Sequence, residues 1–116
     1  MSLPLLTRHL VEKKLTAYCD QKVPAHARHQ VRLTFEIDGN KVTLIEERDA
    51  FAQPGTWTQM PIAQFRFTSD TTIWTLYCPN FRKKDAWRIY PEAKPGKDFD
   101  ALVKAVDEDK LCAFWG

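Results

Sequence analysis

Three carboxylates near the middle of the chain come closest, in residue type and order, to a catalytic arrangement. Asp38 is followed by the run Glu46-Glu47-Arg48. Carboxylates can hold Mg²⁺, and a cation beside them can stabilise an attacked phosphate, as in metal-dependent phosphodiesterases and nucleases. Arg48 cannot act as a base, because a guanidinium stays protonated in proteins, and Asp38 also suits a turn. A divergent nuclease using Asp38, Glu46 and Glu47 is therefore the alternative hypothesis.

Other catalytic and metal-binding patterns are absent from the sequence. The four glycines are isolated, so there is no Gly-rich phosphate loop, and no Ser/His/Asp order appears. His26 and His29 stand beside Pro24 in a predicted loop, and two imidazoles alone make a poor metal-ligand set. We therefore expect no metal site and no cofactor.

Composition limits the class of protein. The 116 residues are 44% hydrophobic and 12% aromatic, which is typical of a single folded domain over residues 1–116. A net charge of +2 is too small to indicate nucleic-acid binding by itself. Three cysteines without a secretory signal predict a cytoplasmic location. No apolar run approaches the roughly 18 residues of a transmembrane helix, so we expect no membrane contact.

The elements that must position these residues follow from hydrophobic periodicity. Steps of three and four predict a helix over 5–22, whose buried face contains Leu6, Leu10, Val11, Leu15, Tyr18 and Cys19. Alternation predicts strands over 31–38, 41–48, 62–68, 72–78 and 86–90, the first two joined by an Asp38-Gly39 turn. Residues 49–60, with Phe51 and Trp57, are predicted to form a loop. A second helix is expected from Asp98, as N-cap, to about residue 108.

This order of elements predicts an α+β fold. A five-stranded antiparallel meander would carry the N-terminal and the C-terminal helix on one face, in a two-layer α-β5-α arrangement. The aromatic pair Phe114-Trp115 should dock against the first helix or the adjoining sheet edge, because two large rings gain by burial. The opposite sheet face would then be open to solvent or to a partner.

The open sheet face is the predicted binding surface. With Trp87 and Ile89 turned toward the helices, the polar phase of the strands carries the candidate binding residues Arg32, Glu36, Glu47, Arg66, Tyr77, Arg88 and Tyr90. Arginine binds phosphate bidentately and tyrosine stacks, so the face suits an anionic ligand, a nucleic acid or a protein. Cross-strand pairing of Arg32 or Arg66 with Glu36 or Glu47 is the purely structural alternative, and self-association would use the same residues. We expect a binding module rather than an enzyme.

An ordered series of motifs resembles one short bacterial family, the domain of unknown function numbered 3024. The resemblance covers nearly the whole chain from the first predicted strand onward. Residues 81–85 depart from the shorter, Gly-containing turn of other members. Because the family has no established activity, the resemblance implies a cytoplasmic single domain and supplies no catalytic residues. The motifs that carry it are Asp38-Gly39, Val42-Thr43-Leu44, Glu47-Arg48, Gly55-Thr56-Trp57-Thr58, Pro61-Ile62-Ala63-Gln64-Phe65-Arg66-Phe67, Trp74-Thr75-Leu76-Tyr77, Trp87, Tyr90-Pro91 and Phe114-Trp115-Gly116.

Overall fold

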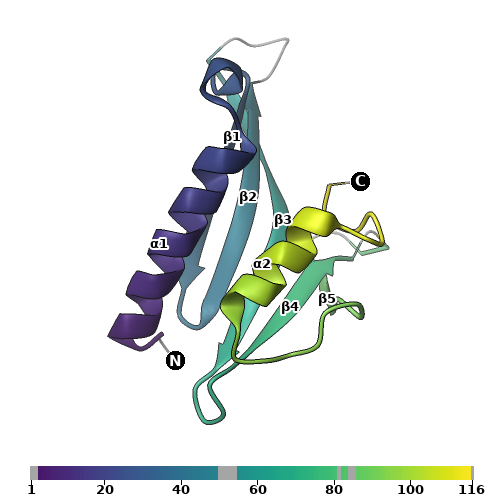
Figure 1. Cartoon of the computed structure of the whole chain (residues 1–116). Helices are drawn as coiled ribbons and strands as arrows, with labels where there is room; N and C mark the ends of the chain where they lie inside the picture. The colour runs from purple at the N-terminus through teal and green to yellow at the C-terminus, as the bar shows by residue number, and fades with distance from the viewer. Residues whose placement is uncertain (1–2, 50–54, 81, 84–85, 116) are drawn as a thin grey trace.

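The computed structural model describes residues 3–49, 55–80, 82–83 and 86–115. These residues form two α-helices and a five-stranded sheet (Figure 1). Neighbouring strands of the sheet are antiparallel and follow chain order. Both helices lie on the same side of the sheet and share one hydrophobic core with it. The predicted α+β meander is thereby confirmed. The elements are α1 (Leu5–Lys22), a short 3₁₀ helix η1 (Ala25–Ala27), β1 (Val31–Asp38), β2 (Lys41–Asp49), β3 (Trp57–Thr68), β4 (Ile73–Pro79), β5 (Trp87–Ile89) and α2 (Phe99–Glu108).

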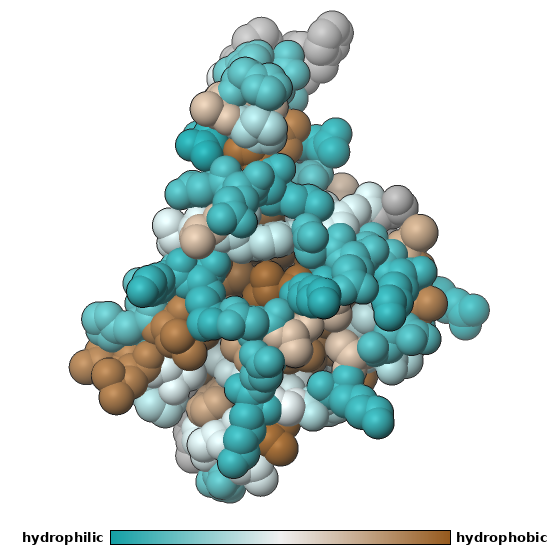
Figure 2. All heavy atoms as spheres, viewed as in Figure 1, coloured by the Kyte–Doolittle hydropathy of each residue, from teal (hydrophilic) through white to brown (hydrophobic). Residues whose placement is uncertain are grey.

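Helix α1 has the predicted bounds but buries a narrower stripe than predicted. Val11, Leu15 and Cys19, at four-residue steps, are its buried residues. Leu6 is 85% exposed and Leu10 47% exposed, so placing them on the buried face was wrong. At about 100° per residue, both lie about 100° or more around the helix from Val11. These leucines, with Leu5, form an exposed apolar group near the first turns of α1, where Figure 2 shows a brown patch.

Strand β3 is longer than predicted. It begins at Trp57 and runs for 12 residues, so the expected loop over 49–60 was wrong at both of its ends. A bulge hides the strand in the sequence: Leu44 lies opposite Ala63 and Ile45 opposite Pro61, which leaves Ile62 as an extra residue. Pro61 is tolerated because β4 pairs with β3 only from Gln64 onward. Phe51 lies outside the described residues.

Strand β5 has the opposite phase to the predicted one. Arg88 pairs with Cys78, which is fully buried on the helix side, and Ile89 pairs with Tyr77 on the uncovered side. Ile89 is 56% exposed, whereas Tyr90 is 1% exposed and its ring centroid lies 4.7 Å from that of Phe114. The prediction that Trp87 and Ile89 face the helices while Arg88 and Tyr90 face away was therefore wrong. The gain from burying the Tyr90 ring decides the phase of this short strand.

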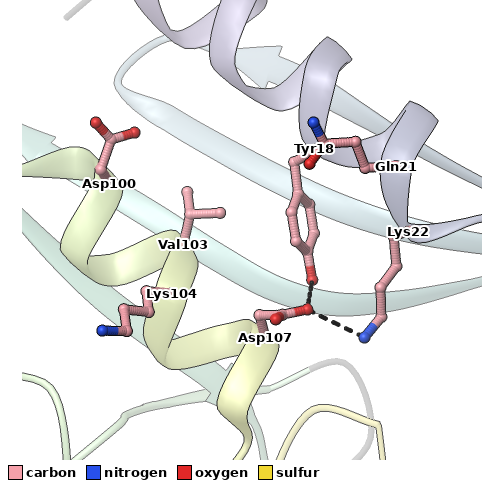
Figure 3. Close-up of a pocket in the computed structure, with 7 residues that line it drawn as sticks. All are labelled: Tyr18, Gln21, Lys22, Asp100, Val103, Lys104 and Asp107. Carbon is pink, nitrogen blue, oxygen red and sulfur yellow. Dashed lines mark hydrogen bonds and ion pairs between the residues drawn. The ribbon is translucent and has the colours of Figure 1, made fainter.

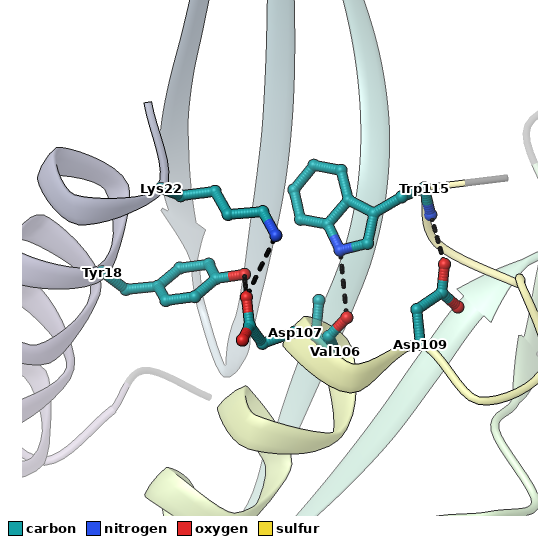
Figure 4. A network of polar contacts seen from close by, with 6 residues as sticks. All are labelled: Tyr18, Lys22, Val106, Asp107, Asp109 and Trp115. Atoms are coloured by element: carbon teal, nitrogen blue, oxygen red, sulfur yellow. Dashed lines mark hydrogen bonds and ion pairs between the residues drawn. The ribbon is translucent and has the colours of Figure 1, made fainter. Parts of the chain in front are cut away.

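Helix α2 and the tail close the core. Asp98 caps α2 as predicted, its carboxylate accepting from the amides of Asp100 and Ala101. Asp109 ends the helix in the left-handed conformation, with φ of 47°, and its carboxylate accepts from three tail amides. Figure 4 shows the hydrogen bond donated by the Trp115 amide. Phe114 is buried, and the Trp115 indole donates to the carbonyl of Val106 at 3.0 Å while lying beside Lys22 of α1. Docking of the aromatic tail is confirmed.

Candidate binding surface on the uncovered sheet face

Cross-strand register determines which side chains share the face that α1 and α2 leave uncovered. Residues directly opposite one another in neighbouring strands project to the same side. Arg32 lies opposite Glu47, and Glu36 lies opposite Thr43. From β2 the same face continues through Gln64 on β3 to Tyr77 on β4. Five of the predicted site residues, Arg32, Glu36, Glu47, Arg66 and Tyr77, therefore lie on this face.

Arg66 lies on the middle strand, at the end of the face near the β1–β2 turn, and is held in a fixed orientation. Its guanidinium lies 3.8 Å from the centroid of the Tyr77 ring, within cation–π range. Its Nε donates to Oε1 of Gln64 at 2.7 Å, and the Gln64 amide in turn donates to the Thr43 hydroxyl at 3.0 Å. Within the described chain, no carboxylate lies within 4 Å of Arg66. The guanidinium therefore keeps its terminal nitrogens available to a ligand.

Lys41 is a second cation, whose backbone position is opposite that of Arg66. The two residues are opposite each other in the β2–β3 ladder, and Lys41 is exposed. Like charges in this position repel, at a cost of up to about 1 kcal/mol, unless an anion lies between them. Asp38 is opposite Lys41 on β1, yet no ion pair within 4 Å joins them. We call Lys41, Arg66 and Tyr77 the basic cluster.

Arg32 is held differently at the other end of the face. Its guanidinium lies 3.5 Å from the centroid of the Trp57 ring, and its Nε lies 4.0 Å from a carboxylate oxygen of Glu47. The other Glu47 oxygen accepts from the Gln59 amide at 2.9 Å. Arg32 and Glu47 thus follow the structural alternative of cross-strand pairing, whereas Arg66 does not.

Sequence reasoning misplaced two candidate residues and missed two others. Arg88 is on the helix side of β5 and Tyr90 is in the core, so neither belongs to the uncovered face. Burial raises the pKa of Tyr90, as expected for a phenol in an apolar surrounding. The missed residues are Lys41, which continues the alternation of Thr43 and Glu47, and Trp57, which was assigned to a loop.

The three carboxylates of the nuclease hypothesis do not converge. Glu46 lies opposite Leu33, on the helix side of the sheet, while Glu47 lies on the uncovered side. Asp38 is six residues along β1 from the position opposite Glu47, which is about 20 Å at 3.3 Å per residue. Among the described residues, no group of three or more His, Cys, Asp or Glu side chains could hold one metal ion. Asp38, Glu46 and Glu47 therefore do not form the shared metal site that the nuclease hypothesis requires of them.

A groove lies between α1 and α2, on the helix side of the sheet (Figure 3). It has a volume of about 470 Å³ and is lined by both helices. Four of its polar lining residues are engaged: Asp107 accepts from the Tyr18 hydroxyl and from Lys22, and Asp100 pairs with Lys14. Burial and the bond to Asp107 raise the pKa of Tyr18 above its ordinary value, and Lys22 lowers the pKa of Asp107. These contacts join the helices and leave little polar capacity for a ligand.

In the described part of the chain, neither helix has the length and apolarity needed to cross a membrane. Searches of curated proteins and of solved structures gave no match to the chain. The family model described as "Domain of unknown function (DUF3024)" matches residues 3–116. This match spans nearly the whole chain and agrees with the motif series from Asp38 to the aromatic tail. The chain therefore belongs to the DUF3024 family.

Proposed function

We propose that this protein is a non-enzymatic binding module and that the uncovered sheet face binds a phosphate-bearing anionic ligand at the basic cluster. One observation carries the proposal: Lys41 and Arg66 occupy opposite positions in the β2–β3 ladder on an uncovered face, and Arg66 has no carboxylate partner within 4 Å among the described residues. An anion between the two cations removes their repulsion and gains charge-assisted hydrogen bonds.

The support for Arg66 makes it the centre of the site. Stacking on Tyr77 and the bond from Nε to Gln64 fix the guanidinium plane before any ligand arrives. A side chain that is already ordered loses less conformational entropy on binding. Its outer face can stack on an aromatic base, while its terminal nitrogens donate to a phosphate. Arg32 on Trp57, with the Glu47 carboxylate beside it, offers a second point of contact along the same face.

A labelled single-stranded oligonucleotide is the sharpest probe, because it presents phosphates and bases together. Fluorescence anisotropy would measure its dissociation constant at about 50 mM and 200 mM salt. Two phosphate contacts give a slope of about −1.4 in log affinity against log salt, which is about a sevenfold loss over this range. We expect Arg66→Gln to weaken binding at least about tenfold and to reduce the slope by about half.

Arg88→Gln is the matched control. It removes the same charge from an exposed side chain on the other side of the sheet, so net charge changes equally in both variants. Binding that is retained in Arg88→Gln and lost in Arg66→Gln and Lys41→Gln supports the basic cluster. Equal effects of all three variants, or no oligonucleotide binding at either salt concentration, would overturn the proposal.

A further inference from the structure

Strand β1 forms one edge of the sheet and lacks several of the features that commonly block pairing with another strand. It has eight residues and contains no proline, glycine or lysine, and its ladder with β2 runs without a bulge. Exposed edges with these properties are templates for a further strand, which is why most proteins block them. Helix α1 packs against β1 from the helix side of the sheet and donates no backbone hydrogen bond to it in the described chain.

The backbone groups of alternate residues in β1 point away from the sheet. A two-residue turn makes Asp38 and Lys41 a hydrogen-bonded pair, and such pairs recur at every second residue. The Asp49 amide donates to the Gln30 carbonyl at 2.9 Å, which agrees with this parity. Even-numbered residues of β1 therefore bond to β2, and the odd-numbered residues Val31, Leu33, Phe35 and Ile37 present their N–H and C=O groups at the edge.

The side chains of β1 are complementary to those of a second, antiparallel copy of β1 when the two strands are centred on Thr34. In an antiparallel pair of two β1 strands with Thr34 at the centre, Leu33 of one copy lies opposite Phe35 of the other, and Val31 opposite Ile37. This register brings odd-numbered residues together, as their free backbone groups require. On the uncovered side, Arg32 of each copy lies opposite Glu36 of the other, so both charged pairs are of opposite sign.

The partial exposure of the β1 side chains is consistent with a sheet edge that another strand can cover. Leu33, Phe35 and Ile37 contact the core but remain only partly buried. Glu36 is exposed and forms no ion pair within the described residues, and Arg32 is 4.0 Å from its nearest carboxylate. We propose that β1 pairs with β1 of a second copy of this chain, forming a two-fold symmetric dimer with a continuous ten-stranded sheet. The two-fold axis keeps all four helices on one side and joins the two uncovered faces on the other.

Two opposite charge reversals test the pairing. Glu36→Lys alone and Arg32→Glu alone each place like charges opposite one another twice across the two-fold axis. We expect each variant to dimerise at least about tenfold more weakly than the original chain. In an equimolar mixture of the two variants, every introduced charge meets an opposite charge across the mixed pair. The mixture should therefore recover the dimer, a result that general destabilisation of either variant cannot produce.

Sedimentation equilibrium from about 5 μM to about 500 μM, a range that includes weak association, would measure these dimers. Glu92→Lys, the same charge change at an exposed residue outside the strands, should dimerise like the original chain. Hydrogen exchange gives a second readout, in which the odd-numbered β1 amides become protected as concentration rises, while the even-numbered amides are protected throughout. A monomer at all concentrations, or a dimer unaffected by both charge reversals, would overturn the proposal. Lys41 and Arg66 take no part in the pairing, so loss of oligonucleotide binding in their variants is independent of dimerisation. Glu36→Lys tests dimerisation without altering Arg32, the second proposed ligand contact.

Discussion

The Tyr18 hydroxyl of α1 donates to Oδ1 of Asp107 of α2 at 3.0 Å, and so joins two residues that are 89 positions apart in the chain. The same carboxylate oxygen accepts from Lys22 at 3.1 Å, so one acceptor holds two donors of α1 against α2. Through Lys22, which also lies 5.0 Å from the ring centroid of Trp115, this contact extends to the tail (Figure 4).

Replacing Asp107 by Asn should lower stability at neutral pH by about 0.5–1 kcal/mol, because the ion pair is half exposed. The pKa of Asp107 is lowered in the folded protein, first by Lys22. The stabilisation is therefore present above the pKa of the unfolded chain and is lost as pH falls through the lower, folded value. Urea unfolding at pH 7 and near pH 3 should show the difference between the two proteins shrinking in acid. Asp20→Asn, which alters a looser exposed pair, is the control.

Phe114→Ala should cost about 3–5 kcal/mol, because the ring is 4% exposed and packs on Tyr90. Calorimetry should show the melting temperature falling by more than about 10 °C. Leu111→Ala removes a neighbouring apolar side chain that is 46% exposed and should change the melting temperature little. Equal melting of the Phe114 variant and the original protein would mean that the tail is not docked in solution.

Asp109→Ala should destabilise the protein by about 1–3 kcal/mol, because three tail amides lose their acceptor. Alanine is also less tolerant than Asp of the left-handed conformation found at this position. Asp109→Asn keeps one acceptor oxygen and the tolerance of positive φ, so its loss should be clearly smaller. Chemical denaturation of the three proteins would check this order, and the reverse order would contradict the capping role.

Mg²⁺ should leave the melting temperature unchanged at millimolar concentration, since Asp38, Glu46 and Glu47 cannot share one ion. Thermal denaturation with Mg²⁺ and with a matched ionic strength of Na⁺ would measure this. A saturable increase that disappears in Asp38→Asn would restore the nuclease hypothesis.

The sequence was sufficient for the fold wherever local signals agreed. Asp38-Gly39 fixes the turn, with Gly39 at φ of 61°, and the alternation on both sides then sets the register of β1 and β2. The N-cap at Asp98 and the helical spacing of Phe99, Leu102 and Val106 likewise predicted α2.

The errors arose where tertiary packing overrides the local pattern. A bulge at Ile62 interrupts the alternation of β3 and concealed Trp57 as a strand residue. In the three-residue β5, burial of Tyr90 outside the strand decides which side Arg88 takes. For the candidate site, alternation placed Arg66 and Tyr77 correctly. The importance of Lys41 emerges only from the cross-strand pairing, because the two cations are 25 residues apart in sequence.

Joining α1 to α2 and the tail has a consequence during synthesis. The ribosome makes α1 and the whole sheet before residues 99–115, yet Phe99, Leu102, Val106 and Phe114 belong to the same core as Val11 and Leu15. Until those residues emerge, the apolar side chains of β3 and β4 are not covered by α2 and the tail. Tyr18 likewise lacks its partner Asp107. The growing chain therefore exposes apolar core residues, through which it can aggregate or bind chaperones. Folding is completed by contacts that span most of the sequence.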